Sequence, residues 1–253
     1  VDLDVPRAIA VFGARPQDAD PSDFRAIASL FGELAPEIKV QAATLGKSVG
    51  ALIAMPPESD PGSFAEEAKQ LVAAASAAAG SEFVAGVSSV CDDSARYPEA
   101  LAEARQVLDC IRRYGNERGP AVVSAADLGL GRVFLATADP QAITEFASST
   151  FGSLVEDTNK RDLLATLSLF FENMASIRNC AVRLGVHENT IRYRLARLEE
   201  LTGLAITHDP DAQLGARLSL LVLTLNGSLA AGDLVQDHRA GPSRALKLVG
   251  AAG

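Results

Sequence analysis

The chain has 253 residues, of which 48% are hydrophobic, and a formal net charge of -9. This length and hydrophobic content are enough for two domains, each with its own buried core. Its three cysteines are odd in number and lack CxxC spacing, which argues against a disulfide framework or a zinc site. Cys91, Cys110 and Cys180 are therefore expected to be small core residues, and unpaired cysteines fit a reducing cytoplasm.

Two further classes of segment are missing from the printed sequence. The longest Ala-rich stretch, Leu71 to Ala79, is far too short to span a bilayer. No charged and then apolar leader is found either, although the first residue is Val1 and a further upstream region is expected. We therefore expect a cytoplasmic protein that does not insert into membranes.

The first part of the chain predicts strands alternating with helices. Residues 6–14 are typical of a buried strand, and a turn rich in Pro and Asp follows them. The next helix is expected to run through Phe24, Ile27, Leu30, Phe31 and Leu34. Residues 40–46 and 49–56 then predict two strands, which are joined as a hairpin around Gly46-Lys47-Ser48.

The next segments repeat this alternation. Ser63 and Glu66 have the spacing of a capping box that opens a helix to about Ala79, and residues 82–90 predict a fourth strand. Pro98 begins a helix that ends at Gly115 and carries one apolar face: Leu101, Ala104, Leu108 and Ile111. Residues 121–128 could add a last strand. The order β-α-β-β-α-β-α-β predicts an α+β sandwich, with helices covering a mainly antiparallel sheet.

After Leu128 the pattern becomes helical. Asp139 and Pro140 are expected to be the N-cap and first residue of a helix with the apolar residues Phe146, Phe151 and Leu154. Another helix should run from Lys160 or Arg161 to Phe171.

Residues 176–198 predict two short helices joined by a tight turn. Ser176 can cap the first helix, whose inward face consists of Ile177, Ala181 and Leu184 at i, i+4 and i+7. Gly185 follows directly and suits the left-handed end of a helix, with Val186 as an apolar residue to bury in the turn.

The second helix repeats the apolar spacing with Ile191, Leu195 and Leu198. At 100° per residue, five residues fall on the opposite side, and all but the alanine are polar: Asn189, Arg192, Tyr193, Ala196 and Arg197. Arginine forks match phosphates and the guanine edge, whereas asparagine matches adenine. This pattern is typical of a helix-turn-helix that contacts nucleic acid.

Charge is divided unevenly along the chain. Residues 1–156 hold 12 basic and 22 acidic side chains, whereas residues 157–253 hold 11 and 10. Between positions 176 and 198, five arginines accompany a single acid, Glu188. Since an acidic half would repel a polyanion, any nucleic-acid contact is expected in the C-terminal half.

Past Gly203, a polar link over residues 207–213 is expected to precede an apolar helix at about 214–225. This last helix is predicted to pack under the second helix of the helix-turn-helix. The tail over residues 229–253 is rich in Ala and Gly and is expected to be poorly ordered.

The segments ENMASIRNCAVRLG and VHENTIRYRLARLEELTGL resemble the C-terminal helix-turn-helix of the PucR/CdaR family of bacterial transcription regulators, itself similar to the Fis-type motif. The resemblance covers roughly residues 163–225 and implies that the second helix, about 188–200, reads the major groove. Carried over by position, it puts eight residues at the DNA: His187, Glu188, Asn189, Thr190, Arg192, Tyr193, Arg194 and Arg197.

Two of these residues allow more than one interpretation. Family members usually have a basic or small polar residue where this chain has Glu188. The carboxylate either accepts from cytosine or only favours the helix dipole in the first turn. His187, at the helix entry, is expected to be a cap or a phosphate contact rather than a metal ligand.

The segments FVAGVSS and YPEALAEARQVLD resemble the degenerate GGDEF-like domain that precedes this motif in the same family. A nucleotide cyclase would need acids at the end of its first strand and in its hairpin turn. Neither Phe12-Gly13-Ala14-Arg15 nor the hairpin at 44–50 contains one. Gln41 also stands where a phosphate-binding loop ending at Gly46-Lys47-Ser48 would need glycine, so no catalytic residue, metal or cofactor is predicted.

The sequence therefore predicts a sequence-specific DNA-binding transcription regulator that is not an enzyme. Its parts are expected to be a degenerate GGDEF-like α+β domain at 1–130, connecting helices at 131–160, a helix-turn-helix domain at 161–228 and the tail. Because one helix-turn-helix makes few base contacts, a homodimer on double-stranded DNA is expected. The alternative is an interaction or assembly module whose arginine face docks an acidic partner without touching DNA.

Overall fold

The computed structural model describes residues 5–14, 24–79, 83–157 and 160–229. Chain contacts divide them into two compact units. The described part of the first, the sheet unit, comprises residues 5–14, 24–79, 83–113 and 120–136. That of the second, the helical unit, comprises 114–119, 137–157 and 160–229. The turn predicted after residue 14 and nearly all of the predicted tail lie outside the described residues.

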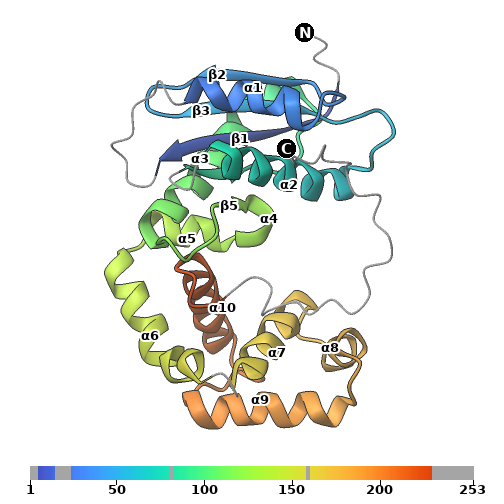
Figure 1. Cartoon of the computed structure of the whole chain (residues 1–253). Coiled ribbons are helices and arrows are strands. Elements are labelled where there is room, and N and C mark those ends of the chain that lie inside the picture. The colour runs from blue at the N-terminus through green and yellow to red at the C-terminus, as the bar shows by residue number, and fades with distance from the viewer. Residues whose placement is uncertain (1–4, 15–23, 80–82, 158–159, 230–253) are drawn as a thin grey trace, which may run out of the picture. The chain divides into compact units, whose positions relative to one another are not determined.

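The sheet unit contains a five-stranded sheet in the order β2-β3-β1-β4-β5 (Figure 1). The strands are β1 (Arg7–Ala14), β2 (Val40–Thr44), β3 (Val49–Ala54), β4 (Phe83–Val87) and β5 (Val122–Ser124). β4 and β5 pair in parallel, and the other pairs are antiparallel. The predicted α+β class and the mainly antiparallel sheet are therefore confirmed.

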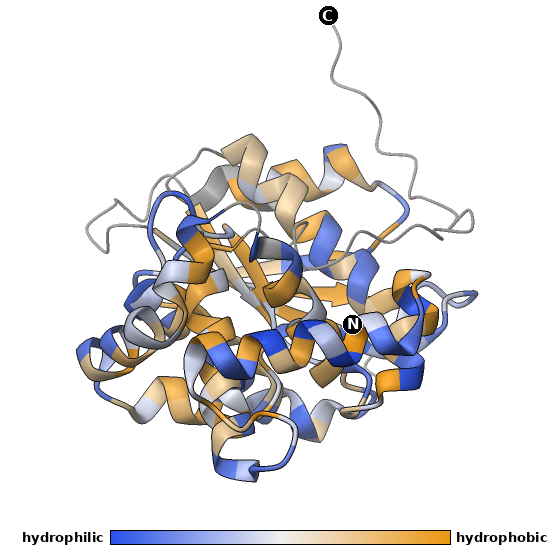
Figure 2. Ribbon diagram, turned by 90° about the horizontal axis from the view of Figure 1, so that it is seen from below, coloured by the Kyte–Doolittle hydropathy of each residue, from blue (hydrophilic) through white to orange (hydrophobic). Residues whose placement is uncertain are grey.

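Helices pack against both faces of this sheet. Ala8, Ala10 and Phe12 of β1 point into the larger core, with α1 (Phe24–Leu34) and α2 (Pro61–Ala79). Ile9 lies on the other face with Ala100 of α3 (Tyr97–Tyr114), which follows the short turn η2 (Ser94–Arg96). In Figure 2 the strands are coloured mainly as hydrophobic. The alternation of side chains along β1 thus explains why this strand is buried throughout.

Gly86 lets α3 lie unusually close to β4. A Cβ atom at this position would lie 2.2 Å from the carbonyl oxygen of Ala104 and 2.6 Å from the backbone nitrogen of Leu108. Both neighbours are helix backbone, which cannot turn away as a side chain can. Glycine is therefore required by the close approach of helix and strand.

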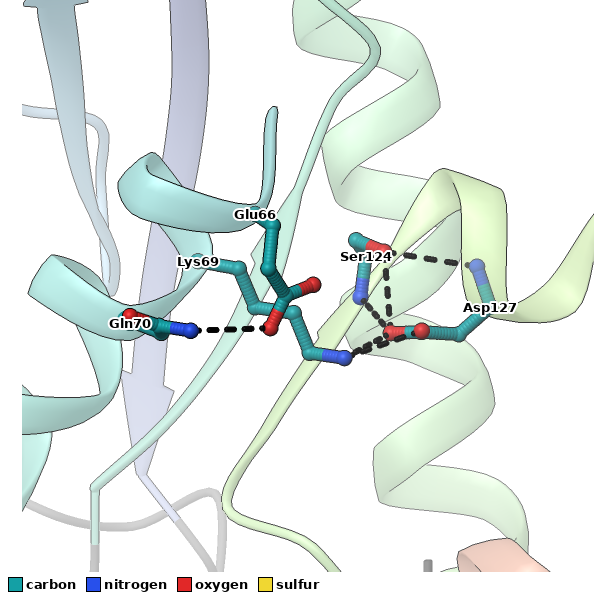
Figure 3. A network of polar contacts seen from close by, with 5 residues as sticks. All are labelled: Glu66, Lys69, Gln70, Ser124 and Asp127. Carbon is teal, nitrogen blue, oxygen red and sulfur yellow. Dashed lines mark hydrogen bonds and ion pairs between the residues drawn. The ribbon is translucent and has the colours of Figure 1, made fainter. Parts of the chain in front are cut away.

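The start of α2 corrects the predicted capping box. The helix begins at Pro61, and the carboxylate of Asp60 accepts from the backbone N–H groups of Gly62 (3.0 Å) and Ser63 (3.3 Å). Glu66 instead accepts from the side chain of Gln70, one turn further on (Figure 3). Asp60 and Pro61 are thus the N-cap and first residue, because an aspartate oxygen satisfies helix N–H groups and proline needs no donor there.

A true capping box follows β5. The hydroxyl of Ser124 accepts from the backbone of Asp127, whose carboxylate accepts from the backbone of Ser124, and this opens α4 (Ala125–Leu128). Lys69 of α2 forms an ion pair with Asp127 at 2.9 Å (Figure 3). The pair joins the end of the sheet to α2, and α5 (Gly131–Thr137) comes next.

The helical unit contains α6 (Pro140–Glu156), α7 (Arg161–Glu172), α8 (Ile177–Leu184), α9 (Glu188–Thr202) and α10 (Pro210–Leu225). Asp139 caps α6 as predicted, because its carboxylate accepts from Gln141. α10, however, begins at Pro210 with Asp209 as its cap, so the predicted polar link includes its first turn. α10 also packs mainly against α6 and then α7, rather than under α9, which corrects the second prediction for this helix.

The three cysteines are buried, as the sequence predicts. Cys110 lies in α3 of the sheet unit and Cys180 in α8 of the helical unit. Burial raises the pKa of each of these two thiols to about 11. Among the described helices, none is long and apolar enough to cross a membrane.

Candidate nucleic-acid interface

α8 is held at both ends by the residues that the sequence indicates. The hydroxyl of Ser176 accepts from the backbone of Asn179 at 3.3 Å. Gly185 ends the helix in the left-handed region at φ 65°, and the N–H of Val186 donates back to the carbonyl of Ala181. The two caps fix the turn, because they satisfy backbone N–H and C=O groups that have no partner within the helix.

α9 begins directly after this turn. Nδ1 of His187 accepts from the backbone of Asn189 at 3.1 Å, so the imidazole is the N-cap of the helix. Gly203 ends the helix at φ 71°. The side chains of Ile191, Leu195 and Leu198 are all buried, which confirms the predicted inward face.

α7 and α8 form the surface on which α9 rests. Thr166 of α7 is fully buried, and its carbonyl accepts a weak hydrogen bond from the thiol of Cys180 in α8. The connection between these helices contains two consecutive left-handed residues that are not glycine, Met174 (φ 53°) and Ala175 (φ 58°). Each such residue costs roughly 1 to 2 kcal/mol, so packing must hold the connection in place.

The opposite side of α9 faces outward. Asn189, Arg192 and Tyr193 are exposed, Tyr193 with 70% of its surface accessible. Arg192 forms an ion pair with Glu188 at 3.4 Å, and Arg197 forms one with Glu200, which raises the pKa of the guanidinium. Such exposed pairs contribute little free energy, so a phosphate or a base edge can replace the carboxylates.

A hollow of about 590 Å³ lies where α8 meets the start of α9. His187, Glu188, Asn189 and Arg192 line it, so the structure brings together four of the eight predicted residues. Three residues of α8 that the sequence did not place at DNA line it as well: Arg178, Ala181 and Val182. Val182 is 75% exposed, which is unusual for a valine on a short helix. The sequence signal for this exposure was the position of Val182 directly after Ala181, which lies on the inward face of α8.

The other four residues divide differently. Tyr193 and Arg197 lie further along the outward face, and Thr190 is half-buried. Arg194 turns instead toward α7, where its guanidinium donates to Oγ1 of Thr166 at 3.1 Å and to Asp162 at 3.4 Å. Arg194 therefore links α9 to α7 rather than pointing away from the unit.

Replacing Arg194 should consequently affect stability. We expect Arg194→Ala to lower the free energy of unfolding of the helical unit by about 1 to 3 kcal/mol, because it removes charged hydrogen bonds from a half-buried position. Urea unfolding followed by circular dichroism measures the change. Arg178→Ala is the matched control, since Arg178 is exposed on α8. Equal stability of both variants would show that the link to α7 contributes nothing.

Comparisons with known proteins agree with these two units. Residues 163–222 match the PucR C-terminal helix-turn-helix domain, and residues 1–110 match the GGDEF-like domain. The chain is 33% identical over 136 residues to the purine catabolism regulatory protein of Bacillus subtilis (strain 168). The chain belongs to the PucR/CdaR family. It carries both domains of this family in the predicted order.

The relatives of this PucR/CdaR chain are longer than the chain itself. The match to the purine catabolism regulatory protein covers 53% of this chain and 25% of that protein. The uncharacterized protein YsfB of the same organism is 35% identical over 72 residues, covering 28% of this chain and 19% of that protein. The chain thus spans a quarter or less of the curated relatives' length.

A solved structure is also similar to the chain. It is the crystal structure of a regulator of polyketide synthase expression from Bifidobacterium adolescentis, with 24% identity and a TM-score of 0.40. The match covers 86% of this chain and 80% of that one.

In the GGDEF-like domain, the places where a nucleotide cyclase would hold its metal ions are the end of β1 and the turn between β2 and β3. β1 ends at Ala14, and the turn between β2 and β3 consists of Leu45, Gly46, Lys47 and Ser48. Within the described ranges, no group of three or more His, Cys, Asp or Glu side chains is arranged to hold a metal ion. Two-metal phosphoryl transfer needs such carboxylates.

Proposed function

We propose that this PucR/CdaR chain is a DNA-binding transcription regulator and that the first half of α9 enters the major groove. The observation that carries the proposal is the division of α9 into two faces. Ile191, Leu195 and Leu198 anchor one face in the helical unit, while the other exposes Asn189, Arg192 and Tyr193. A helix held rigidly on one side and rich in planar donors on the other suits base recognition.

Individual roles follow from position along the helix. Asn189 and Arg192 lie in the first turns of α9, which are the turns that approach base edges in helix-turn-helix complexes. An asparagine pairs best with adenine and an arginine with guanine. Arg197 lies later in the helix and is assigned to a phosphate. Arg178, on α8, is assigned to the neighbouring phosphates of the DNA backbone.

Specific recognition by one such helix covers few base pairs. We therefore infer a homodimer that reads two half-sites about 34 to 36 Å apart, one turn of the DNA helix. The acidic first 156 residues, with 22 acids and 12 bases, are kept away from the phosphates in this arrangement because of their charge.

Replacing the two arginines separately tests the proposal. We expect Arg192→Ala to relax sequence preference, and Arg197→Ala to weaken binding to all sequences and lower the salt slope by about one. Binding is measured by fluorescence anisotropy on duplexes selected from genomic DNA and on random duplexes, at several salt concentrations. Arg105→Ala, an exposed arginine of α3 in the sheet unit, is the matched control.

Each result separates DNA recognition from the alternative. If Arg192→Ala and Arg197→Ala bind selected and random DNA as tightly as the parent chain, this face is not the DNA surface. The arginine face would then serve an acidic protein partner. An effect of Arg105→Ala equal to theirs would instead indicate nonspecific charge attraction.

Glu188 provides a finer test. Its carboxylate lies in the hollow beside Arg192 and pairs with it in the free chain. We expect Glu188→Gln to keep the fold and to change base preference at one position per half-site by about 1 to 3 kcal/mol. Selection of binding sites from a random duplex library measures this preference. An unchanged site profile would leave the carboxylate only its role at the helix start.

A further inference from the structure

β2 is an edge strand, and no other strand of the described residues pairs with its outer side. It is the outermost strand in the order β2-β3-β1-β4-β5, and four of its five residues are exposed. The segment Val40–Thr44 contains no charged residue and no proline. Charges and prolines are the usual means by which proteins prevent edge strands from pairing with other chains.

The opposite edge of the sheet differs. β5 is only three residues long, and all three are buried. It contacts α2 and α4, and a strand of this length has few backbone groups to offer for pairing. Protection of one edge and exposure of the other indicate that β2 is kept available for pairing.

The outward groups of β2 follow from the pairing with β3. The carbonyl of Lys39 accepts from Ala54, and the N–H of Leu45 donates to Ser48. In an antiparallel pair, the residues whose backbone groups bond to the neighbouring strand alternate with residues whose backbone groups point away from it. Positions 39, 41, 43 and 45 therefore bond to β3. Val40, Ala42 and Thr44 therefore direct their N–H and C=O groups away from the sheet.

We propose that β2 pairs antiparallel with β2 of a second copy of this chain, about a two-fold axis at Ala42. In this register, Val40 lies opposite Thr44 of the second copy, and Ala42 lies opposite its own counterpart. In each of these pairs, both residues direct their N–H and C=O groups toward the other copy, so the pair can exchange two backbone hydrogen bonds. The two sheets become one continuous sheet across an isologous interface.

Charge supports this occupant and this register. Glu37 lies three residues before β2 and Lys47 three residues after it, and both are exposed. Pairing about Ala42 brings Glu37 of each copy toward Lys47 of the other at both ends of the interface. Lys39 meets Leu45 of the second copy, where its aliphatic stem can cover the leucine. The strand is thus complementary to itself.

This proposal goes beyond the proposed function, although the homodimer inferred there needs a joining surface. The two can fail separately. Pairing through β2 is measured without DNA, and the DNA contact of α9 is measured by the arginine variants, which leave β2 unchanged.

Cysteine cross-linking of the full chain tests the register. Gln41 and Ala43 of opposite copies form a pair without mutual hydrogen bonds, with Cα atoms about 4.5 Å apart, which a disulfide can span. We expect Gln41→Cys alone, or Ala43→Cys alone, to cross-link poorly, because position 41 of one copy lies opposite position 43 of the other copy. Mixed, reduced and then reoxidised, the two variants should form a disulfide dimer on nonreducing gels, while the native cysteines are buried.

Proline substitution tests the hydrogen bonds. Ala42→Pro removes an outward N–H and leaves the bonds to β3 intact, so the melting temperature should stay unchanged while the dimer dissociates at least about tenfold more readily. Sedimentation equilibrium of the full chain measures this dissociation. Ala43→Pro is the matched control, since it removes an N–H that bonds to β3 and should lower the melting temperature.

Exchange of charges completes the test. Glu37→Lys and Lys47→Glu should each weaken the dimer, and the double variant should restore it. A monomeric parent chain, no cross-link in the mixture, or equal cross-linking by either single variant would overturn the pairing of β2 about Ala42. So would a dimer that Ala42→Pro leaves unchanged.

Discussion

Ile191→Ala is expected to lower the free energy of unfolding of the helical unit by about 2 to 5 kcal/mol. Ile191 has no accessible surface and lies in the first half of α9, where it anchors the helix in the unit. The substitution leaves a cavity that the packed helices can fill only in part. Thermal and urea unfolding, followed by circular dichroism without DNA, measure the loss.

Arg192→Ala is the matched control, because it alters the next residue on the exposed face. Its stability should stay within about 0.5 kcal/mol of the parent, while DNA binding falls. The opposite ranking, in which the exposed arginine determines stability and the buried isoleucine does not, would reject the assignment of the two faces. Leu195→Ala, one turn further along the same buried face, should behave like Ile191→Ala.

Gly86→Ala should destabilise the sheet unit by roughly 3 kcal/mol or more, at the upper end for overpacked cores. The added methyl group would lie 2.2 Å from a backbone oxygen of α3, so helix and strand must move apart. Chemical unfolding monitored through the sheet unit measures the effect.

Gly32→Ala in the same unit is the control for this change. Gly32 lies in α1, and nothing stands within 4 Å of an added Cβ. Alanine there should stabilise the helix by up to about 1 kcal/mol, because it favours helix more than glycine does. Destabilisation by both substitutions would mean that loss of glycine itself, and not the close approach of α3 to β4, is responsible.

Much of the fold could be predicted because local signals were strong. Alternating apolar runs gave the strand and helix order, and left-handed glycines such as Gly185 marked helix ends. The two errors at helix starts share one cause. A helix start is predicted at Asp139-Pro140 but not at Asp60-Pro61 or Asp209-Pro210, although the structure uses all three alike. Neighbouring Ser63 and Glu66, and the polar residues at 207–213, obscured the same chemistry.

The site was predictable only as far as one helix determines it. The buried and exposed faces of α9 follow from the 100° repeat, and the structure has both. Arg194 lies between these faces, so its direction depends on Thr166, which is 28 residues away in the sequence. The same limit applies to Val182 and to the partner of α10, because helical spacing carries no information on which other helix is adjacent.

The rate at which a buried thiol is alkylated measures how often its own unit opens. A thiolate is the form that alkylating reagents attack, and the raised pKa of about 11 keeps Cys110 and Cys180 protonated at neutral pH. Iodoacetamide can therefore modify either residue only during an excursion that exposes it. Mass spectrometry of the folded chain over time, resolved by peptide, would give one rate for the sheet unit and another for the helical unit. Adding duplex DNA should slow the modification of Cys180 and leave that of Cys110 unchanged. Each of the two core residues then measures the opening rate of its own unit within one chain.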